Sequence, residues 1–250
     1  MSRALRVAFV PSLLLLGGCL DELLESPYVL TPGLGEVRAV APGLHGELLV
    51  ASATGLYAID GNGVATRTGE AADGVTVHPG VVYVRRGGTV SYDGGAIDVT
   101  GAVDILAGYD ALAGLYPDRL VLDGRFGHTG PPMPDRVVSL GRTDARAVAL
   151  GPTGYLVTTA TALLAVDADV RVLADGLTDA RAAATDTRGR VYVAHGAPTE
   201  LWRVEPTGLV SMARWLGDTR DLQFGLGGLL PAENVYIANG AGSVDYVRPM

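Results

Sequence analysis

A strand–turn–strand segment recurs six times along this chain at nearly constant spacing. In each copy a charged residue comes first, followed by a small or apolar run, a turn rich in Pro, Gly and Asp, and a second apolar strand. The charged residues that set the register are evenly spread through the chain: Arg38, Asp73, Asp110, Arg146, Arg181 and Arg220. A short, regular period built only from strands is typical of all-β repeat architectures.

Each copy holds four predicted strands. Second strands such as 48–51 and 191–194 are rich in the β-branched, aromatic and aliphatic residues that suit a buried, pleated strand. A third strand then leads into a tight turn, as at Asp60-Gly61-Asn62-Gly63, and Asp-Gly and Asn-Gly turns match the twist of antiparallel strands. A fourth strand, such as 171–174, completes the unit. The sequence therefore predicts an all-β chain, a six-bladed β-propeller of four-stranded antiparallel blades.

The two ends of the repeated region complement each other. The last copy ends with a third strand at 243–247 and has no fourth. Residues 28–34 match the fourth-strand segment 171–177, and the same offset relates Arg38 to Arg181. We therefore expect the N-terminal strand to close the last blade, which removes two exposed sheet edges.

The third copy is irregular. Its first strand is predicted at 111–113 and its second at 120–122, but Pro131, Pro132 and Pro134 occupy the place of a third strand. Because Pro cannot donate a hydrogen bond to a sheet, we expect a loop or a frayed strand near 128–134.

The N-terminal segment resembles a bacterial export signal. Arg3 and Arg6 precede an apolar stretch at 7–16 that is too short to span a bilayer. Leu16-Gly17-Gly18-Cys19 then resembles the lipobox of bacterial lipoproteins, in which the Cys is lipidated. We expect a signal peptide at 1–18, a lipid anchor on Cys19 that attaches the protein to a membrane of the bacterial cell envelope, a tether at 19–27 and the propeller at 28–250. The alternative is that Cys19 is an incidental thiol.

One stretch of the repeat carries a family resemblance. Residues 145–157, which read ARAVALGPTGYLV, resemble the core of NHL-type repeats in six-bladed propellers, and residues 180–194 are similar. The resemblance implies the propeller fold and leaves two functions open. Many such propellers are binding or scaffold modules, whereas the gluconolactonase-like branch consists of metal-dependent hydrolases.

Charge recurs at one repeat position, where the innermost strands of a propeller begin. We expect the six register residues to form a ring at the channel mouth, with four Arg and two Asp leaving that mouth net positive. Arg forks suit carboxylate or phosphate, so the ring is a candidate ligand-binding site. The alternative is that Arg and Asp pair across the mouth as a solvated rim. The net charge of −8 argues against nucleic acid as a partner.

Further candidates come from the connections between second and third strands, which are expected on the same face. They are Arg85, Asp123, His195 and Asn239. The chain's two Trp residues, Trp202 and Trp215, are expected to pack between blades. His45, His78 and His128 are scattered without the spacing of a metal site, so no metal, cofactor or catalytic residue is predicted.

These observations favour a lipid-anchored binding or scaffold propeller whose charged mouth takes a protein or cell-wall ligand. The alternative is a gluconolactonase-like hydrolase. Such an enzyme needs carboxylates and amides that converge on a divalent cation, and Asp73, Asp110, Asp123 and Asn239 are the residues available for that purpose.

Overall fold

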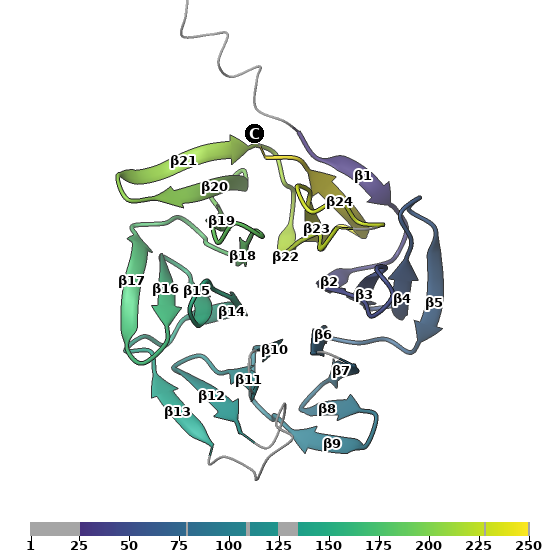
Figure 1. Ribbon diagram of the computed structural model, residues 1–250, viewed down its shortest axis with the longest axis horizontal. Helices are drawn as coiled ribbons and strands as arrows, with labels where there is room; N and C mark the ends of the chain where they lie inside the picture. The colour runs from purple at the N-terminus through teal and green to yellow at the C-terminus, as the bar shows by residue number, and fades with distance from the viewer. Residues whose placement is uncertain (1–25, 79, 109–110, 125–134, 228, 250) are drawn as a thin grey trace, which may run out of the picture.

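The computed structural model describes residues 26–78, 80–108, 111–124, 135–227 and 229–249. These residues form six four-stranded antiparallel sheets around a central axis, which confirms the predicted six-bladed β-propeller (Figure 1). The described part of the chain contains no helix, and therefore none long and apolar enough to cross a membrane.

Each blade is a meander whose first strand lies nearest the axis (Figure 1). Blade 1 consists of β2 (Val37–Pro42), β3 (Leu48–Ser52), β4 (Leu56–Ile59) and β5 (Ala65–Gly69). Blade 2 consists of β6 (Gly74–His78), β7 (Val81–Arg86), β8 (Thr89–Tyr92) and β9 (Gly95–Asp98). Blade 3 consists of β10 (Asp104–Gly108), β11 (Ala111–Leu115), β12 (Arg119–Asp123) and β13 (Arg136–Ser139). Blade 4 consists of β14 (Ala145–Leu150), β15 (Tyr155–Thr159), β16 (Ala162–Val166) and β17 (Val170–Asp175). Blade 5 consists of β18 (Ala182–Thr185), β19 (Val191–His195), β20 (Glu200–Glu205) and β21 (Gly208–Ala213).

Blade 6 joins the two ends of the chain. It consists of β22 (Thr219–Phe224), β23 (Val235–Asn239), β24 (Ser243–Val247) and β1 (Tyr28–Thr31). β1 pairs antiparallel with β24, and the rings of Tyr28 and Tyr246 stack with centroids 5.6 Å apart. Leu34, just after β1, is only 4% exposed and packs in the seam between blades 6 and 1. The predicted closure by the N-terminal strand is confirmed.

The register predicted for the third copy is wrong by one strand. β10 is the innermost strand of blade 3, so residues 111–113 belong to the second strand and 120–122 to the third. β10 follows β6 sooner than the period predicts, and β14 follows β10 later. The extra length lies between β12 and β13, which is why a constant period misplaced the register. The Pro-rich segment itself lies outside the described residues.

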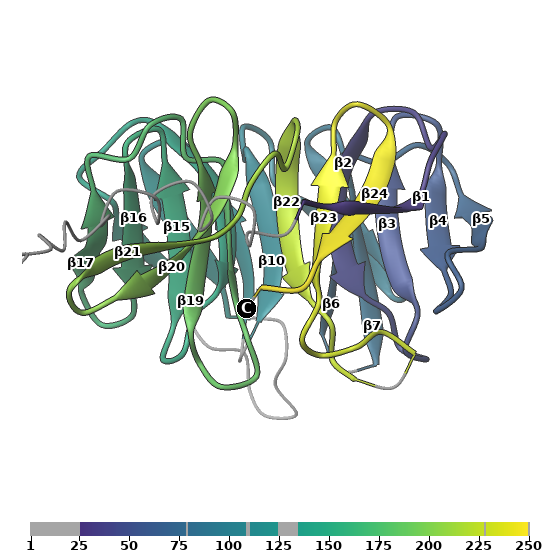
Figure 2. The ribbon, with the colours of Figure 1, turned by 90° about the horizontal axis from the view of Figure 1, so that it is seen from above.

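Small side chains fill the crowded inner strands, and larger ones seal the blades against each other. Ala182, Ala183 and Ala184 of β18 are all buried. Behind them Tyr192 of blade 5 packs on Phe224 of blade 6 with ring centroids 4.9 Å apart. The hydrophobic core is therefore divided among the seams between neighbouring blades, which are arranged around an axis that runs vertically in Figure 2.

Candidate functional site

The inner strands of four blades begin with an acidic residue, any residue and an Arg. The segments are 36–38, 144–146, 179–181 and 218–220. In blades 1, 4 and 6 the strand register shifts by one residue at the Arg itself, which is Arg38, Arg146 or Arg220. The extra residue of a β-bulge leaves the regular alternation of the strand and re-aims its side chain. The bulges turn these Arg side chains towards the channel mouth, the end of the channel where the inner strands begin.

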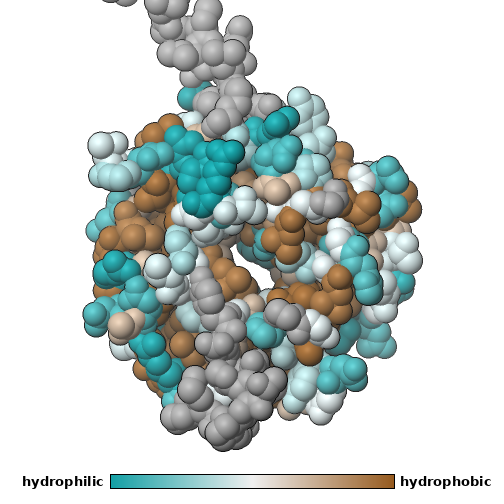
Figure 3. All heavy atoms as spheres, viewed as in Figure 1, coloured by the Kyte–Doolittle hydropathy of each residue, from teal (hydrophilic) through white to brown (hydrophobic). Residues whose placement is uncertain are grey.

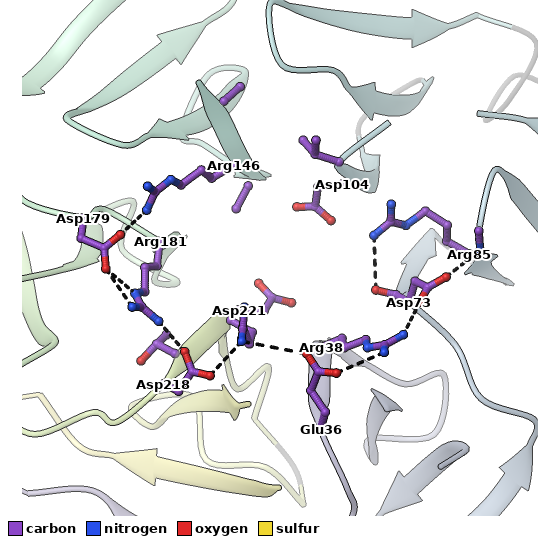
Figure 4. Close-up of a pocket in the computed structure, with 16 residues that line it drawn as sticks. Glu36, Arg38, Asp73, Arg85, Asp104, Arg146, Asp179, Arg181, Asp218 and Asp221 are labelled. Atoms are coloured by element: carbon purple, nitrogen blue, oxygen red, sulfur yellow. Dashed lines mark hydrogen bonds and ion pairs between the residues drawn. The ribbon is translucent and has the colours of Figure 1, made fainter. Parts of the chain in front are cut away.

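Alternating cations and anions form a nearly continuous ring around the mouth (Figure 4). In order of contact, the ring residues are Arg146, Asp179, Arg181, Asp218, Arg220, Glu36, Arg38 and Asp73. Successive contacts alternate between partners from neighbouring blades and partners from the same blade. The ring therefore ties blades 4, 5, 6, 1 and 2 together at their inner edges.

The geometry of the ring varies around the mouth. The Arg181–Asp179 nitrogen–oxygen distance is 2.8 Å and the Arg220–Asp218 distance is 2.9 Å, whereas Arg220 and Glu36 are 3.9 Å apart. Hydrogen bonds from Arg146 and then from Arg181 lower the pKa of Asp179, so this carboxyl is ionised at neutral pH. Because the ring side chains are one-third to one-half exposed, each pair contributes only about 0–1 kcal/mol to stability.

Arg85 extends the charged wall towards blade 3. From β7 it donates to the carbonyl oxygens of Ala102 at 2.8 Å and Asp73 at 3.4 Å. Its Nε is buried and has no hydrogen-bond partner among the described residues. The Asp73 carboxylate in turn accepts a hydrogen bond from the N–H of Gly87 at 2.6 Å. On this side of the mouth, Arg85 and the Asp73 carboxylate are therefore both held by hydrogen bonds to backbone groups.

The ring surrounds a cavity of about 710 Å³. Five Arg and six carboxylate residues line it: Arg38, Arg85, Arg146, Arg181, Arg220, Glu36, Asp73, Asp104, Asp179, Asp218 and Asp221. The expectation of a net positive mouth is therefore wrong, because acidic residues pair with each Arg of the ring.

Two carboxyls face each other deeper in the channel, at a waist formed by Asp104 of blade 3 and Asp221 of blade 6 (Figure 4). Each takes two backbone hydrogen bonds, one from the next residue of its own strand and one from the following blade. The latter are the N–H groups of Val148 at 2.9 Å and Val40 at 3.0 Å. Desolvation by the channel walls raises the pKa of Asp104 to about 6. Desolvation and the nearby Asp104 charge raise the pKa of Asp221 to about 7.

Below the waist the channel becomes apolar. A second cavity of about 350 Å³ is lined mainly by aliphatic residues, among them Val77, Leu106, Leu150 and Leu226. Figure 3 looks onto this far face and shows apolar residues beside the central opening. The two ends of the channel thus differ in chemistry, and only the mouth offers a dense set of polar groups.

Six of the predicted site residues line the mouth cavity: Arg38, Asp73, Arg85, Arg146, Arg181 and Arg220. Asp123 is wrong as a mouth residue. It is buried at the opposite end of blade 3, because its strand is the third and not the second. Asn239 ends β23 opposite Thr219 at the mouth end of blade 6, but it does not line the cavity and donates to Asp245 at 2.8 Å within its own blade. Asp110 lies outside the described residues.

His195 lies at the predicted mouth end of its blade but does not line the mouth cavity. It ends β19 and packs beside Trp202, with ring centroids 5.5 Å apart. Both ring nitrogens are buried without a hydrogen-bond partner among the described residues. Burial lowers the pKa of His195 despite the opposing charge of Glu200, so the ring is neutral near pH 7. The prediction that Trp215 packs between blades is wrong, because 62% of its surface is exposed.

Five carboxylates that line the channel are not among the residues predicted from the sequence: Glu36, Asp179, Asp218, Asp104 and Asp221. The first three had a readable signal, since each stands two residues before a ring Arg. Asp104 and Asp221 had no comparable signal. They share a structural position in opposite blades, which only the strand register reveals.

Among the described residues, the carboxylates and imidazoles do not gather as a hydrolytic metal centre would require. No group of three or more His, Cys, Asp or Glu residues within the described ranges could hold a metal ion. The carboxylates of the mouth are paired with Arg, and those of the waist accept backbone N–H groups. Of the four residues that the sequence offered for such a centre, only Asp73 lines the mouth cavity, and Asp110 is not described.

Solved structures share this architecture. A virginiamycin B lyase from Staphylococcus aureus is 10% identical, with a TM-score of 0.62 over 90% of this chain and 99% of that one. A gluconolactonase from Xanthomonas campestris is 13% identical, with a TM-score of 0.63 over 93% of each chain. A PQQ-bound aldose sugar dehydrogenase from Streptomyces coelicolor is 14% identical, with a TM-score of 0.62 over 89% of this chain and 97% of that one. No family model and no curated protein matches the sequence. At these identities the likeness shows the fold alone, and it agrees with the propeller expected from the repeat.

Proposed function

We propose that this chain is a non-enzymatic binding propeller that takes a polar ligand into its charged channel mouth, and that a lipid on Cys19 anchors it to a membrane of the bacterial cell envelope. The observation that carries the proposal is the ring of ion pairs around an open cavity of about 710 Å³. A ligand seated there would replace water and meet donors and acceptors that are already held in place.

The pairing of the ring favours a ligand with both donors and acceptors over a simple anion. A guanidinium has five N–H donors, and Arg181 uses three of its donor positions on Asp179 and Asp218. The carboxylates likewise keep lone pairs that Arg does not occupy. The remaining groups alternate around the mouth, which suits hydroxyl- and amide-rich molecules of the cell wall or a polar protein segment.

A metal-dependent hydrolase of the gluconolactonase type is the alternative that the shared fold suggests. The named neighbours are a virginiamycin B lyase, a gluconolactonase and an aldose sugar dehydrogenase, but they are only 10%, 13% and 14% identical to this chain. Because the donor set described above does not converge on a metal ion, binding is the better-supported function.

The test is retention of a ligand from fractionated envelope extract by the purified protein. Arg38→Gln combined with Arg146→Gln removes one ring cation from each of two well-separated blades. Arg171→Gln is the matched control, because Arg171 is an exposed, paired Arg outside the mouth cavity. We expect the double variant to lose the retained ligand while its Tm falls by only a few degrees, since exposed pairs contribute about 0–1 kcal/mol each. Equal retention by wild type, control and double variant would show that the ring is only a solvated rim.

A further inference from the structure

Trp215 stands out among the exposed apolar residues near the mouth. It lies in the connection between β21 and β22, and 62% of its surface is exposed. Its φ angle is 64°, in the left-handed region that bulky L-residues rarely adopt. The next residue, Leu216, is fully buried and its N–H donates to the carbonyl oxygen of Thr199 at 3.0 Å. The backbone directly after Trp215 is therefore held in place, while the Trp215 indole itself faces solvent.

The other repeats show that the fold does not require this side chain. Leu34 and Leu177 are the equivalents of Leu216, each buried and each four residues before a ring Arg. The residues before them are Gly33 and Gly176, with φ angles of 77° and 69°. A Cβ added to either glycine would meet no atom within 4 Å. The position therefore needs only a left-handed backbone, which glycine adopts freely.

A Trp in this place is strained and exposed, and strain of this kind collects at functional sites. Trp215 lines a hollow of about 430 Å³ together with residues 196–199 and Gly217. Arg181 and Asp218 belong to the same hollow and also to the mouth ring, so the hollow continues the mouth cavity. The site therefore combines one broad apolar face with a fixed donor and a fixed acceptor at its edge.

This combination matches the chemistry of a pyranose. A sugar ring presents C–H groups on its face and hydroxyls around its edge, so it packs on an indole while its hydroxyls bond to charged groups beside it. We propose that Trp215 is the stacking platform of a saccharide subsite, with Arg181 and Asp218 bonding the sugar hydroxyls. This inference rests on the proposed function, because it names the ligand class of the same mouth.

Intrinsic fluorescence tests the subsite directly, because the chain has only two Trp residues. Trp202→Phe leaves Trp215 as the sole reporter. We expect saturable quenching of Trp215 by at least one of three probes: maltotriose, an N-acetylglucosamine trimer or a galacturonic acid trimer. Calorimetry on otherwise wild-type protein should then show that Trp215→Gly weakens binding about tenfold or more, whereas Trp215→Tyr retains most of it.

The control is Leu226→Ala, since Leu226 is 68% exposed at the far end of the channel. It should leave sugar binding unchanged. The inference is overturned if none of the three sugars perturbs Trp215 up to its solubility limit, or if Trp215→Gly binds the sugar as tightly as wild type.

The two proposals fail separately. If sugars do not bind but ligand retention from envelope extract still depends on Arg38 and Arg146, the saccharide subsite is wrong and the binding mouth stands. If sugar binding depends on Trp215 but the Arg38→Gln/Arg146→Gln variant retains the ligand from envelope extract as well as wild type does, the subsite stands and the ring is not the binding surface.

Discussion

The two ends of the chain pair as β1 and β24 within blade 6, and the segment after β1 then crosses into the seam between blades 6 and 1. Leu34 lies in this seam and is 4% exposed, packed with Val37 and Leu48 of blade 1 and with Tyr236 and Val244 of blade 6. Leu177 is its equivalent in the seam between blades 4 and 5 and is also 4% exposed. Substituting each of the two leucines therefore compares the seam beside the chain closure with a seam between two blades that are consecutive in the sequence.

Leu34→Ala and Leu177→Ala should destabilise the protein equally. Truncating a fully buried Leu costs about 2–5 kcal/mol, and we expect about 3 kcal/mol at each site because both lie in close-packed clusters. In a chain of this length 1 kcal/mol corresponds to roughly 2–4 °C, so each Tm should fall by about 6–12 °C. The backbone N–H of each Leu donates to a neighbouring carbonyl, at 3.0 Å for Leu34 and 2.8 Å for Leu177. The backbone is therefore held in place at both sites, and we expect no difference in stability from this source.

Urea unfolding of the two variants measures the comparison, with Leu226→Ala as an exposed control that should change stability by less than about 0.5 kcal/mol. A Leu34→Ala cost below about half that of Leu177→Ala would refute the reasoning. It would mean that residues 28–34 detach from blade 6 before the ring unfolds, so that the closure does not hold the fold together.

Two further predictions concern the channel waist and the N-terminus. Carbon NMR of the carboxyl groups should place the pKa of Asp104 at about 6 and that of Asp221 at about 7, both above the ordinary 3.8. Because the folded state favours the protonated forms, their contribution to stability is full below pH 3.8 and is lost as the pH rises through 6 and 7; titration of both groups near pH 4 would contradict the desolvated waist. Cys19→Ser should move the protein from the detergent phase to the aqueous phase, because acyl chains supply the membrane affinity. Equal partitioning of wild type and Cys19→Ser would remove the lipid anchor from the proposal.

Local sequence determined the blades. Alternating β-formers and Asp-Gly or Pro-Gly turns specify four short strands, and these signals act over a few residues. The ring closure was also readable, because residues 28–34 repeat residues 171–177 and the last copy lacks a fourth strand. The repeat period gave the wrong register in the third copy. Asp110 stands at the expected spacing, but the inner strand of that blade begins at Asp104.

The mouth was readable only in part. Charge at the start of the inner strands marked Arg38, Arg146, Arg181 and Arg220, but pairing across blades made their surroundings neutral. The spacing of a sequence repeat does not indicate which residue of the neighbouring blade a long Arg side chain will contact.

Only the tertiary structure decided which polar groups share the channel. Asp104 and Asp221 come from opposite blades, and their shifted pKa values arise because the folded walls exclude water and place the two charges within reach of each other. Trp215 likewise shares a hollow with the ring residues Arg181 and Asp218, and Arg181 comes from a distant part of the sequence. The sequence by itself determined what each repeat becomes, because strand and turn preferences are local. The site depended on how six repeats meet around one axis, and that is a property of the closed ring.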